Sequence, residues 1–261
     1  MWSQLTEWKE SRVRFVIATV IQTHGSTPQK LGAQMAVTLD HQRDTVGGGA
    51  FEAWVIEVAR GMIQAEGTEK IYFEEVHLSH DLGMCCGGRM KVMFQRYDPP
   101  PRLWILGAGH IGSALAKLAE MADFQVTLVD DRPEWTDPST FSDKIDVICD
   151  DPCLWVRSQA LDHQLYVVVT THSHVLDQEL IGILAREELA YLGLIGSRAK
   201  WERFKSRLST FEGELKLHQV RCPMGIQINA KEPMEIGVSV IAELIQKRNE
   251  ASVPKQNSLS D

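Results

Sequence analysis

One stretch, residues 103–131 with the sequence LWILGAGHIGSALAKLAEMADFQVTLVDD, constrains the fold of this chain more than any other. Its first four residues predict a buried strand, residues 113–121 have the apolar spacing of a helix, and residues 125–129 predict a second strand. Glycines at positions 107, 109 and 112 form a G-x-G-x-x-G turn between the first strand and the helix. This order predicts a β-turn-α-β unit of the Rossmann type.

The turn and the acidic pair Asp130-Asp131 after the second strand predict a nucleotide-like ligand. Unpaired amides at a helix start favour an anion, and the glycines let phosphates approach the backbone. A carboxylate at the end of the second strand would accept hydrogen bonds from a ribose and would repel a 2′-phosphate. Arg132 beside it leaves that choice open. A scaffold with an empty crevice is the alternative interpretation.

The composition limits the class of partner. The chain has 261 residues, enough for two modest domains, and its net charge of −8 disfavours nucleic acid or an anionic membrane. The first residues lack an apolar segment of signal-peptide length, and no apolar run approaches a membrane span. Five cysteines without disulfide-framework or zinc-ribbon spacing suit a reducing compartment. We therefore expect a cytoplasmic protein.

Residues 98–102 begin with the run Asp-Pro-Pro-Pro and predict a stiff linker between two domains. We expect an N-terminal α+β domain at residues 1–97. A Rossmann-type parallel-sheet domain with a C-terminal helix should follow at residues 103–250, and the polar residues 251–261 should form a disordered tail. The predicted fold class is therefore α/β.

Apolar and alternating runs predict the remaining strands, at residues 14–22, 34–39, 69–76 and 90–96 in the first domain and 144–149, 165–170 and 192–195 in the second. In the second domain, strands alternate with helical segments, which indicates a parallel sheet with ligands at the carboxyl ends of its strands. A final helix at residues 233–248 has an apolar face that needs a partner, and the N-terminal domain is one candidate.

Gly47, Gly48 and Gly49 directly precede a helix with apolar residues on one face. Three glycines at a helix start are a possible second anion cradle. The alternative is a flexible connection that lets the helix pack tightly.

Cys85 and Cys86 lie together in a loop, before two glycines and close to Arg89. One interpretation is that one of them is a small buried apolar residue. Another is an exposed thiolate, favoured by nearby amides and the arginine, which binds a soft metal or takes part in sulfur chemistry. A disulfide between the two neighbours is a third option.

His172, His174 and Asp177 follow the predicted strand at residues 165–170. These side chains are suited to binding a metal or moving protons. The alternative is that they cap the next helix and hydrogen-bond the loop.

Ser197, Arg198 and Lys200 follow the predicted strand at residues 192–195. At a helix start they indicate a further anion contact. The alternative is that the two basic side chains form only a solvated face.

Taken as a set, these loops resemble the XdhC/CoxI family, the xanthine dehydrogenase accessory proteins. The resemblance covers about residues 14–248. The matching segments are Gly25-Ser26-Thr27-Pro28 with Gly32-Ala33, Gly47-Gly48-Gly49, Cys85-Cys86-Gly87-Gly88, Gly107-Ala108-Gly109-His110-Ile111-Gly112, Val129-Asp130-Asp131-Arg132-Pro133, Thr171-His172 with His174 and Leu176-Asp177, Leu194-Ile195-Gly196-Ser197-Arg198 with Lys200, and Pro233 with Glu235-Ile236.

The resemblance implies a maturation factor rather than an enzyme with turnover of its own. Such a protein binds molybdenum cofactor (molybdopterin or a dinucleotide form of it), protects it, and helps its sulfuration and insertion into a molybdenum hydroxylase such as xanthine dehydrogenase. The implied partners are the apo-hydroxylase and a cysteine desulfurase, and a homodimer is expected.

The residue patterns and the resemblance together predict a set of cofactor-binding residues. Cys86 and Cys85 are the predicted molybdenum contacts, because a thiolate is a soft donor. The full set is Gly25, Ser26, Thr27, Gly47, Gly48, Gly49, Cys85, Cys86, Gly87, Gly88, Gly107, Gly109, His110, Gly112, Asp130, Asp131, His172, Ser197 and Arg198.

The alternative function is an NAD(P)-dependent oxidoreductase. It would use Asp130 for the ribose and His172 or His174 as acid and base. The cysteine pair favours the maturation factor, because hydride transfer needs no thiol. The sequence leaves open which molybdenum enzyme is served, which cysteine acts, and whether NAD(P) fills the Rossmann crevice.

Overall fold

The structure is a computed structural model that describes residues 2–65, 69–209 and 215–250. The chain divides between Pro99 and Pro100 into two compact units, which we call unit 1 and unit 2. The division falls inside the stretch that we expected to be a linker. The expected disordered tail, residues 251–261, lies outside the described residues.

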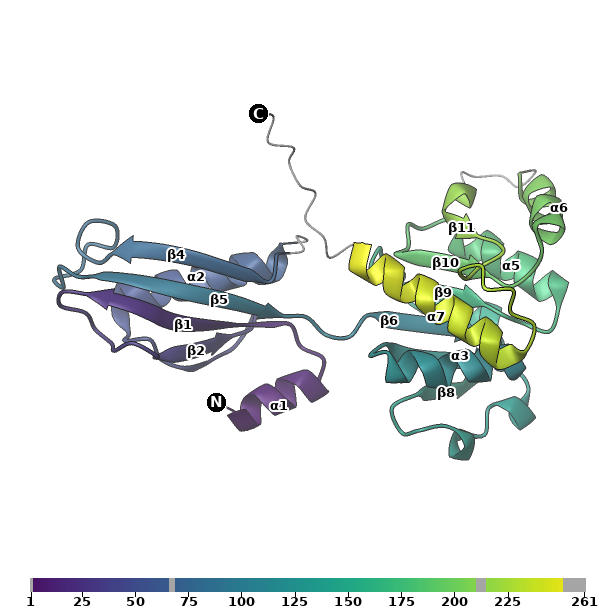
Figure 1. Ribbon diagram of the computed structural model, residues 1–261, viewed down its shortest axis with the longest axis horizontal. Helices are drawn as coiled ribbons and strands as arrows, with labels where there is room; N and C mark the ends of the chain where they lie inside the picture. The colour runs from purple at the N-terminus through teal and green to yellow at the C-terminus, as the bar shows by residue number, and fades with distance from the viewer. Residues whose placement is uncertain (1, 66–68, 210–214, 251–261) are drawn as a thin grey trace. The chain divides into compact units, whose positions relative to one another are not determined.

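Unit 1 is one antiparallel sheet with helices (Figure 1). The sheet order is β3-β2-β1-β5-β4, and every neighbouring pair is antiparallel. In chain order its elements are α1 (Trp2–Glu10), β1 (Phe15–His24), β2 (Gln34–Val37), β3 (Gln42–Asp44), α2 (Gly49–Gln64), β4 (Ile71–His77) and β5 (Arg89–Tyr97).

The alternation of β1 explains how the two helices of unit 1 pack. Val16, Ala18 and Val20 are buried in one cluster with the inner face of α2, whereas Phe15 and Ile17 are buried in a second cluster beside α1. Side chains that alternate along a strand lie on opposite faces of the sheet. The residues that α2 buries recur every fourth position, at Phe51, Val55, Ala59 and Ile63.

A charged cluster closes the end of unit 1. Asp98 pairs with Arg14 at 2.7 Å, with Arg96 at 3.1 Å and with Lys70 at 3.7 Å. The guanidinium groups of Arg14 and Arg96 also donate to carbonyl oxygens at the C-terminal end of α2. These bonds satisfy helix-end carbonyls that lack intrahelical donors.

Unit 2 is a six-stranded parallel sheet with the order β11-β10-β9-β6-β7-β8 (Figure 1). If β6 to β11 are numbered 1 to 6 along the chain, their order across the sheet is 6-5-4-1-2-3, which is the Rossmann order. The direction in which successive strands are added reverses between β6 and β9. The strands are β6 (Arg102–Leu106), β7 (Gln125–Asp130), β8 (Asp146–Cys149), β9 (Tyr166–Val169), β10 (Tyr191–Leu194) and β11 (Val220–Arg221). The helices are α3 (His110–Met121), α4 (Pro152–Ser158), α5 (His174–Leu184), α6 (Arg198–Leu208) and α7 (Pro233–Glu250).

The helices of unit 2 cover both faces of its sheet. The buried residues of α4, α5 and α6 belong to one core cluster, and those of α3 and α7 belong to another. A Cβ added to Gly237 of α7 would lie 3.0 Å from the Leu118 side chain of α3, so these two helices are closely packed. The final helix therefore buries its apolar face within unit 2, and the expectation of a partner face in the N-terminal domain is corrected.

The predicted fold class is confirmed: an α+β unit precedes a Rossmann-type unit with a C-terminal helix. Three elements were not predicted, namely α1, β3 and β11. All three residues of β3 are exposed and polar, and β11 has two residues, so neither has an apolar pattern to detect. Within the described residues, no helix combines the length and apolarity that crossing a membrane requires.

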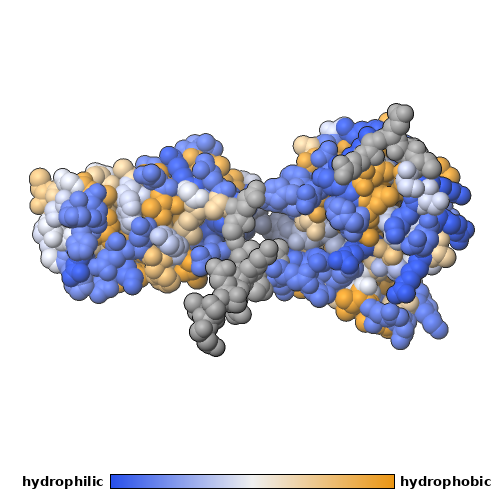
Figure 2. Space-filling view, turned by 90° about the horizontal axis from the view of Figure 1, so that it is seen from above, coloured by the Kyte–Doolittle hydropathy of each residue, from blue (hydrophilic) through white to orange (hydrophobic). Residues whose placement is uncertain are grey.

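Apolar side chains also reach the surface of both units. On the face drawn in Figure 2, orange areas lie among hydrophilic ones in each unit. Among the exposed large apolar side chains of unit 1 are Ile71, Tyr72 and Phe73 of the edge strand β4, which are 40–52% exposed. An edge strand with exposed apolar residues can pair with another strand.

Candidate functional site

The glycine turn of unit 2 lies where the strand order reverses, between β6 and α3. A Cβ on Gly107, which has φ +112°, would lie 2.5 Å from the carbonyl oxygen of Thr170, and one on Gly112 would lie 1.8 Å from the Gly107 oxygen. Both positions therefore need glycine for packing. A Cβ on Gly109 would meet only Arg132 Nη2, at 3.7 Å. Gly109 is thus the least crowded of the three glycines, with only the Arg132 side chain in contact.

Asp130 is buried at the end of β7, and its carboxylate accepts four hydrogen bonds. The N–H of Ala108 lies 2.7 Å from Oδ2, and Arg132 donates from its backbone N (3.0 Å), Nε (2.8 Å) and Nη2 (2.8 Å). Burial by itself raises the pKa of Asp130, but the hydrogen bonds from Arg132 and Ala108 outweigh it and hold this pKa below its ordinary value.

These four bonds bear on the role that we expected for Asp130. An ionised carboxylate has about four lone-pair sites, and all of them are used here by the chain itself. In this geometry the chain itself occupies the oxygens that a ribose hydroxyl would need, and the ribose contact at Asp130 stays a prediction.

Arg132 lies in a small aromatic cluster beside the turn. Its guanidinium carbon is 5.4 Å from the ring centre of Trp135, and the same indole meets the exposed ring of His110 edge-on at 4.8 Å. Sequence reasoning predicted His110 but missed Trp135. The i, i+2 spacing of Asp130 and Arg132 at a strand end was the available signal for their pairing.

Asp131 and His172 meet from either side of β6. Both side chains are exposed, and one ligand atom from each lies within 4.8 Å of the other and of an Asp130 oxygen. Because Asp130 is already saturated, only two of these three groups remain available. Two exposed groups alone do not define a metal site.

The loop after β9 is organised around Asp177, which is buried. Its Oδ1 accepts from the hydroxyl of Thr171 at 2.7 Å, and its Oδ2 accepts from Lys200 Nζ at 2.6 Å. Exposed His174 lies 3.9 Å from the same oxygen. Asp177 thus holds the loop and the next helix together, which agrees with the capping interpretation.

The loop after β10 is closed by the same ion pair. Lys200 also donates to the Ile195 carbonyl at 2.9 Å, and a Cβ on Gly196 would lie 2.5 Å from the lysine Cδ. Ser197 caps α6 by accepting from the Lys200 N–H at 3.2 Å. Lys200 is therefore committed to Asp177, and Arg198 is the exposed basic residue that remains for an anion contact.

Cys222 follows β11 and lies near this pair, with its Sγ 3.9 Å from the carbonyl oxygen of Ser197. Burial raises the pKa of Cys222 to about 11, although the ammonium of Lys200 acts in the opposite direction. The thiol is therefore protonated near neutral pH.

In unit 1 the predicted loops contact one another. The N–H of Gly88 donates to the carbonyl oxygen of Ser26 at 3.1 Å, and a Cβ on Gly88 would lie 2.4 Å from that oxygen. Gly25 is also close to this loop, since its Cβ would be 3.3 Å from Gly88 Cα. The loop at residues 25–28 and the loop at residues 85–88 are therefore locked together by their backbones.

The glycine triplet at residues 47–49 already holds an anionic group of the chain. Oε2 of Glu52, in the first turn of α2, accepts from the N–H groups of Val46 at 3.3 Å and Gly48 at 3.1 Å, and from the hydroxyl of Thr45. A carboxylate at this place complements the positive end of the helix. Within the triplet Glu52 thus occupies the N–H of Gly48, and an anion cradle for a ligand at residues 47–49 stays a prediction.

The two neighbouring cysteines have different surroundings. Cys85 is exposed, whereas Cys86 is partly buried against the core beneath α2. Both are free thiols, so the disulfide between neighbours is absent from this structure. Met84 of the same loop approaches Gly49, at 4.0 Å from the position of an added Cβ. The cysteine loop therefore lies close to the start of α2.

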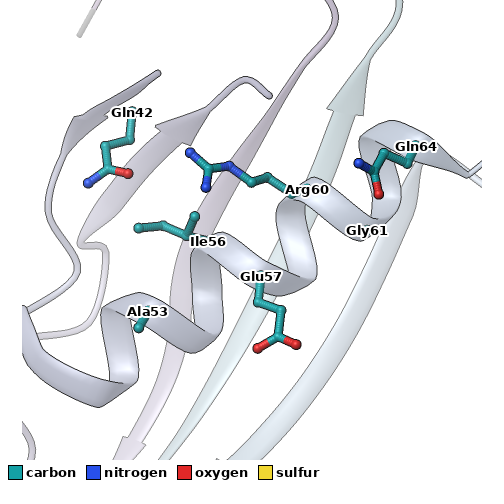
Figure 3. A pocket seen from close by; sticks show the side chains of 7 residues that line it. All are labelled: Gln42, Ala53, Ile56, Glu57, Arg60, Gly61 and Gln64. Carbon is teal, nitrogen blue, oxygen red and sulfur yellow. The ribbon is translucent and has the colours of Figure 1, made fainter. Parts of the chain in front are cut away.

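Two surface grooves lie apart from the loops described above. One of about 550 Å³ runs along α2 beside β3, and its lining residues are Gln42, Ala53, Ile56, Glu57, Arg60, Gly61 and Gln64. Figure 3 shows Arg60 and Glu57 extending from α2 in different directions, so they do not form a paired charged site. A second groove, of about 360 Å³, is lined by Arg157, Val175, Gln178, Glu179, Gly182, Ile183, Arg186, Leu208 and Leu215. Neither groove contains a predicted cofactor-binding residue.

Two family models match this chain. Residues 103–244 match a model described as the XdhC Rossmann domain, and residues 8–74 match one described as the XdhC and CoxI family. The two matches lie in unit 2 and unit 1 respectively.

Two curated relatives and one solved structure are similar. The Escherichia coli (strain K12) protein called "Uncharacterized protein YqeB" is 30% identical over 257 residues, which are 96% of this chain and 47% of the relative. A Bacillus subtilis (strain 168) protein, described as a probable xanthine dehydrogenase subunit, is 35% identical over 164 residues, 62% of this chain and 48% of the relative. A crystal structure described as a xanthine dehydrogenase from Bacillus halodurans is 21% identical, with a TM-score of 0.55 over 99% of this chain and 97% of that one.

These similarities differ in what they support. At 21% identity, the solved structure supports the fold alone. The chain spans about half the length of the curated relatives that it matches.

Proposed function

The chain belongs to the XdhC and CoxI family, and on that premise we propose that it is a cytoplasmic accessory protein for a molybdenum hydroxylase of the xanthine dehydrogenase type. Its cargo is molybdenum cofactor, which it binds, protects and helps to sulfurate and insert. Its partners are the apo-hydroxylase and a cysteine desulfurase, and it works as a homodimer. It performs no turnover reaction of its own.

The observation that carries this proposal is the position of Cys85. This exposed thiol lies in a loop that is fixed by the hydrogen bond between Gly88 and Ser26 and that contacts the start of α2. A thiolate is a soft donor suited to a metal that sulfur ligands already hold. A fixed loop can present such a donor without a large ordering cost.

Polar groups near Cys85 suit the other end of the cargo. Molybdopterin carries a phosphate and a pterin with several hydrogen-bonding groups. Ser26 is exposed, and the Thr27 hydroxyl, which donates to the Gln29 carbonyl oxygen at 3.1 Å, can still accept a hydrogen bond from these groups. Gly47–Gly49 is less suited to the phosphate, because the Glu52 carboxylate already accepts from the N–H of Gly48 and would repel a second anion.

Cys86 has a different role in this proposal. Because it is partly buried against the core, it supports the loop rather than contacting the metal. Cys85 is then the primary molybdenum contact, and the substitution of each cysteine has a different expected result.

The test is to purify the full chain from a host that makes molybdenum cofactor and to measure bound molybdenum and the fluorescent oxidised pterin released by acid. Cys85→Ser should lose most of both, whereas Cys149→Ser, at an exposed cysteine of unit 2, should retain them. Absence of pterin from the parent protein would contradict cargo binding. Equal cofactor in the parent and Cys85→Ser would contradict the thiolate contact alone.

The delivery step needs its own measurement. Cofactor-loaded protein should activate an apo-hydroxylase, and prior incubation with a cysteine desulfurase and cysteine should raise the active fraction. A loaded protein that never transfers cofactor would be a storage protein instead of an insertion factor.

A further inference from the structure

The end of β7 is where a Rossmann crevice distinguishes two kinds of adenine dinucleotide. An acidic residue there binds the 2′-hydroxyl of an unmodified ribose, and a nearby arginine accommodates a 2′-phosphate. This chain has both residue types, Asp130 and Arg132, so the sequence alone does not decide between the two ligands.

The hydrogen bonds decide which of the two residues is available. Asp130 accepts four bonds, three of them from Arg132, and has no capacity left for a hydroxyl. Arg132 keeps donors: Nε and Nη2 bind Asp130, while Nη1 makes no hydrogen bond within the part of the chain that the structure describes. Nη1 is therefore the part of the guanidinium that remains to bind a ligand.

The guanidinium is also held in place beside the glycine turn. Two hydrogen bonds of 2.8 Å fix it to Asp130, and its carbon lies 5.4 Å from the ring centre of Trp135. Nη2 lies 3.7 Å from the position of a Cβ on Gly109, at the least crowded point of the turn. A donor fixed in this way loses little conformational entropy when it binds an anion.

We propose that Arg132 is the specificity-determining residue of the unit 2 crevice, and that this crevice binds an adenine dinucleotide with a 2′-phosphate in preference to one with an unmodified ribose. This binding is separate from the cargo site proposed for unit 1. The preferred ligand is therefore NADP, and NAD is disfavoured. The proposal concerns binding and requires no hydride transfer.

Three nearby carboxylates oppose a phosphate. The guanidinium of Arg132 itself neutralises Asp130 at 2.8 Å, and the weight of the other two can be judged from their exposure. Asp131 and Glu134 are both exposed, so water and salt screen their charges. The side chain of Arg132 is only 26% exposed, and its contact with a phosphate would be a direct charge-assisted hydrogen bond. The direct contact outweighs the two screened charges.

Calorimetric titration of the full chain with NADP and with NAD tests the proposal. The wild type should bind NADP at least about tenfold more tightly than NAD, as expected for one or two charge-assisted hydrogen bonds. Arg132→Gln should reduce this ratio to about twofold or less. Arg157→Gln, which removes an exposed arginine of α4 from the same unit, should keep the full ratio.

Asp131→Asn separates this proposal from its rival. If Arg132 reads the ligand, the variant keeps or increases the preference for NADP, because one repulsive charge is removed. If Asp131 instead accepts the ribose hydroxyls, the wild type prefers NAD and the variant loses NAD binding, which overturns the proposal. Circular dichroism melting of each variant shows that the fold is retained.

The remaining outcomes also count against the proposal. A wild type that binds neither nucleotide, or an Arg132→Gln protein that keeps the NADP preference, would overturn it. Pterin and molybdenum are measured separately, so a protein that carries cofactor but binds no nucleotide would leave the proposed function standing.

Discussion

Lys200 and Asp177 form a buried ion pair, with Nζ 2.6 Å from Oδ2, that joins the first turn of α6 to the first turn of α5. The two side chains are 11% and 1% exposed, so water screens the pair little. The loops after β9 and β10 both depend on this contact. Residues that look like an anion site and an acid-base site in the sequence therefore form one structural bridge.

Replacing Lys200 by methionine should be strongly destabilising. The variant leaves the Asp177 carboxylate buried without its cation, and removing one partner of a buried pair costs about 3–5 kcal/mol. Urea unfolding followed by circular dichroism measures this cost. Lys216→Met is the control, because its pair with Glu188 is long, at 3.9 Å, and more exposed, so its loss should cost about 0–1 kcal/mol. Equal midpoints for the two variants would contradict the bridge.

Asp130 should make the stability of unit 2 depend on pH in the acid range. Its pKa is lower in the folded protein than in the unfolded chain, where it is about 3.9. The stabilisation is therefore complete above the unfolded value and is lost as the pH falls through the folded value. Urea unfolding between pH 6 and pH 2.5 should show this loss in the wild type.

Two variants isolate that contribution. Asp130→Asn has no carboxyl to titrate, so its free energy of unfolding should fall less steeply below about pH 4. Asp143→Asn removes an exposed carboxylate and should keep the wild-type slope. A steep acid loss that survives in Asp130→Asn would assign the pH dependence to another group.

The cysteines should differ in their rates of alkylation. Burial raises the pKa of Cys222 to about 11 and that of Cys153 to about 12, so few thiolates form at these positions near pH 8. Cys85 and Cys149 are exposed and should react first with iodoacetamide, as measured by peptide mass spectrometry. Raising the pH toward 10 should accelerate Cys222 most clearly, since it is only partly buried. Rapid labelling of Cys222 at pH 8 would show that its surroundings are more open.

Much of the fold could be predicted, because apolar patterns carry it. The buried run at residues 103–106 and the every-fourth-residue pattern of α2 are visible in the sequence and correspond to core residues. Apolar patterns do not predict the exposed strand β3, which has no buried side chain, or β11, which has only two residues. The first helix, α1, buries only Leu5 and Trp8 in its described part, which is too few for a periodic signal.

The candidate site was predictable in position but not in its internal bonds. Glycine spacing predicted the turn at Gly107 and the loop that contains Gly88. It did not predict that Gly88 contacts the loop at residues 25–28. The sequence does not show which carboxylates accept hydrogen bonds from the chain itself. Glu52 accepts from an N–H at the start of its own helix, and Asp130 accepts from Ala108 and Arg132. Such partners depend on side-chain geometry after folding, and spacing alone does not encode them.

Gly88 and Gly87 provide a matched pair for testing the loop that carries Cys85. A Cβ on Gly88 would lie 2.4 Å from the carbonyl oxygen of Ser26, a backbone atom that cannot move aside cheaply, whereas a Cβ on Gly87 meets nothing within 4 Å. Gly88→Ala should therefore cost about 1–3 kcal/mol of unfolding free energy, and Gly87→Ala should be close to neutral.

The same pair connects loop geometry with cargo binding. If Cys85 contacts molybdenum only when the two loops are locked, Gly88→Ala should lose bound molybdenum and pterin while retaining its cysteine, and Gly87→Ala should keep both. Measurement at a temperature where circular dichroism shows both variants folded separates this effect from unfolding. A folded Gly88→Ala protein with a full complement of cofactor would mean that the thiol acts without the backbone contact to Ser26, and the loop would then be a flexible arm instead of a fixed ligand.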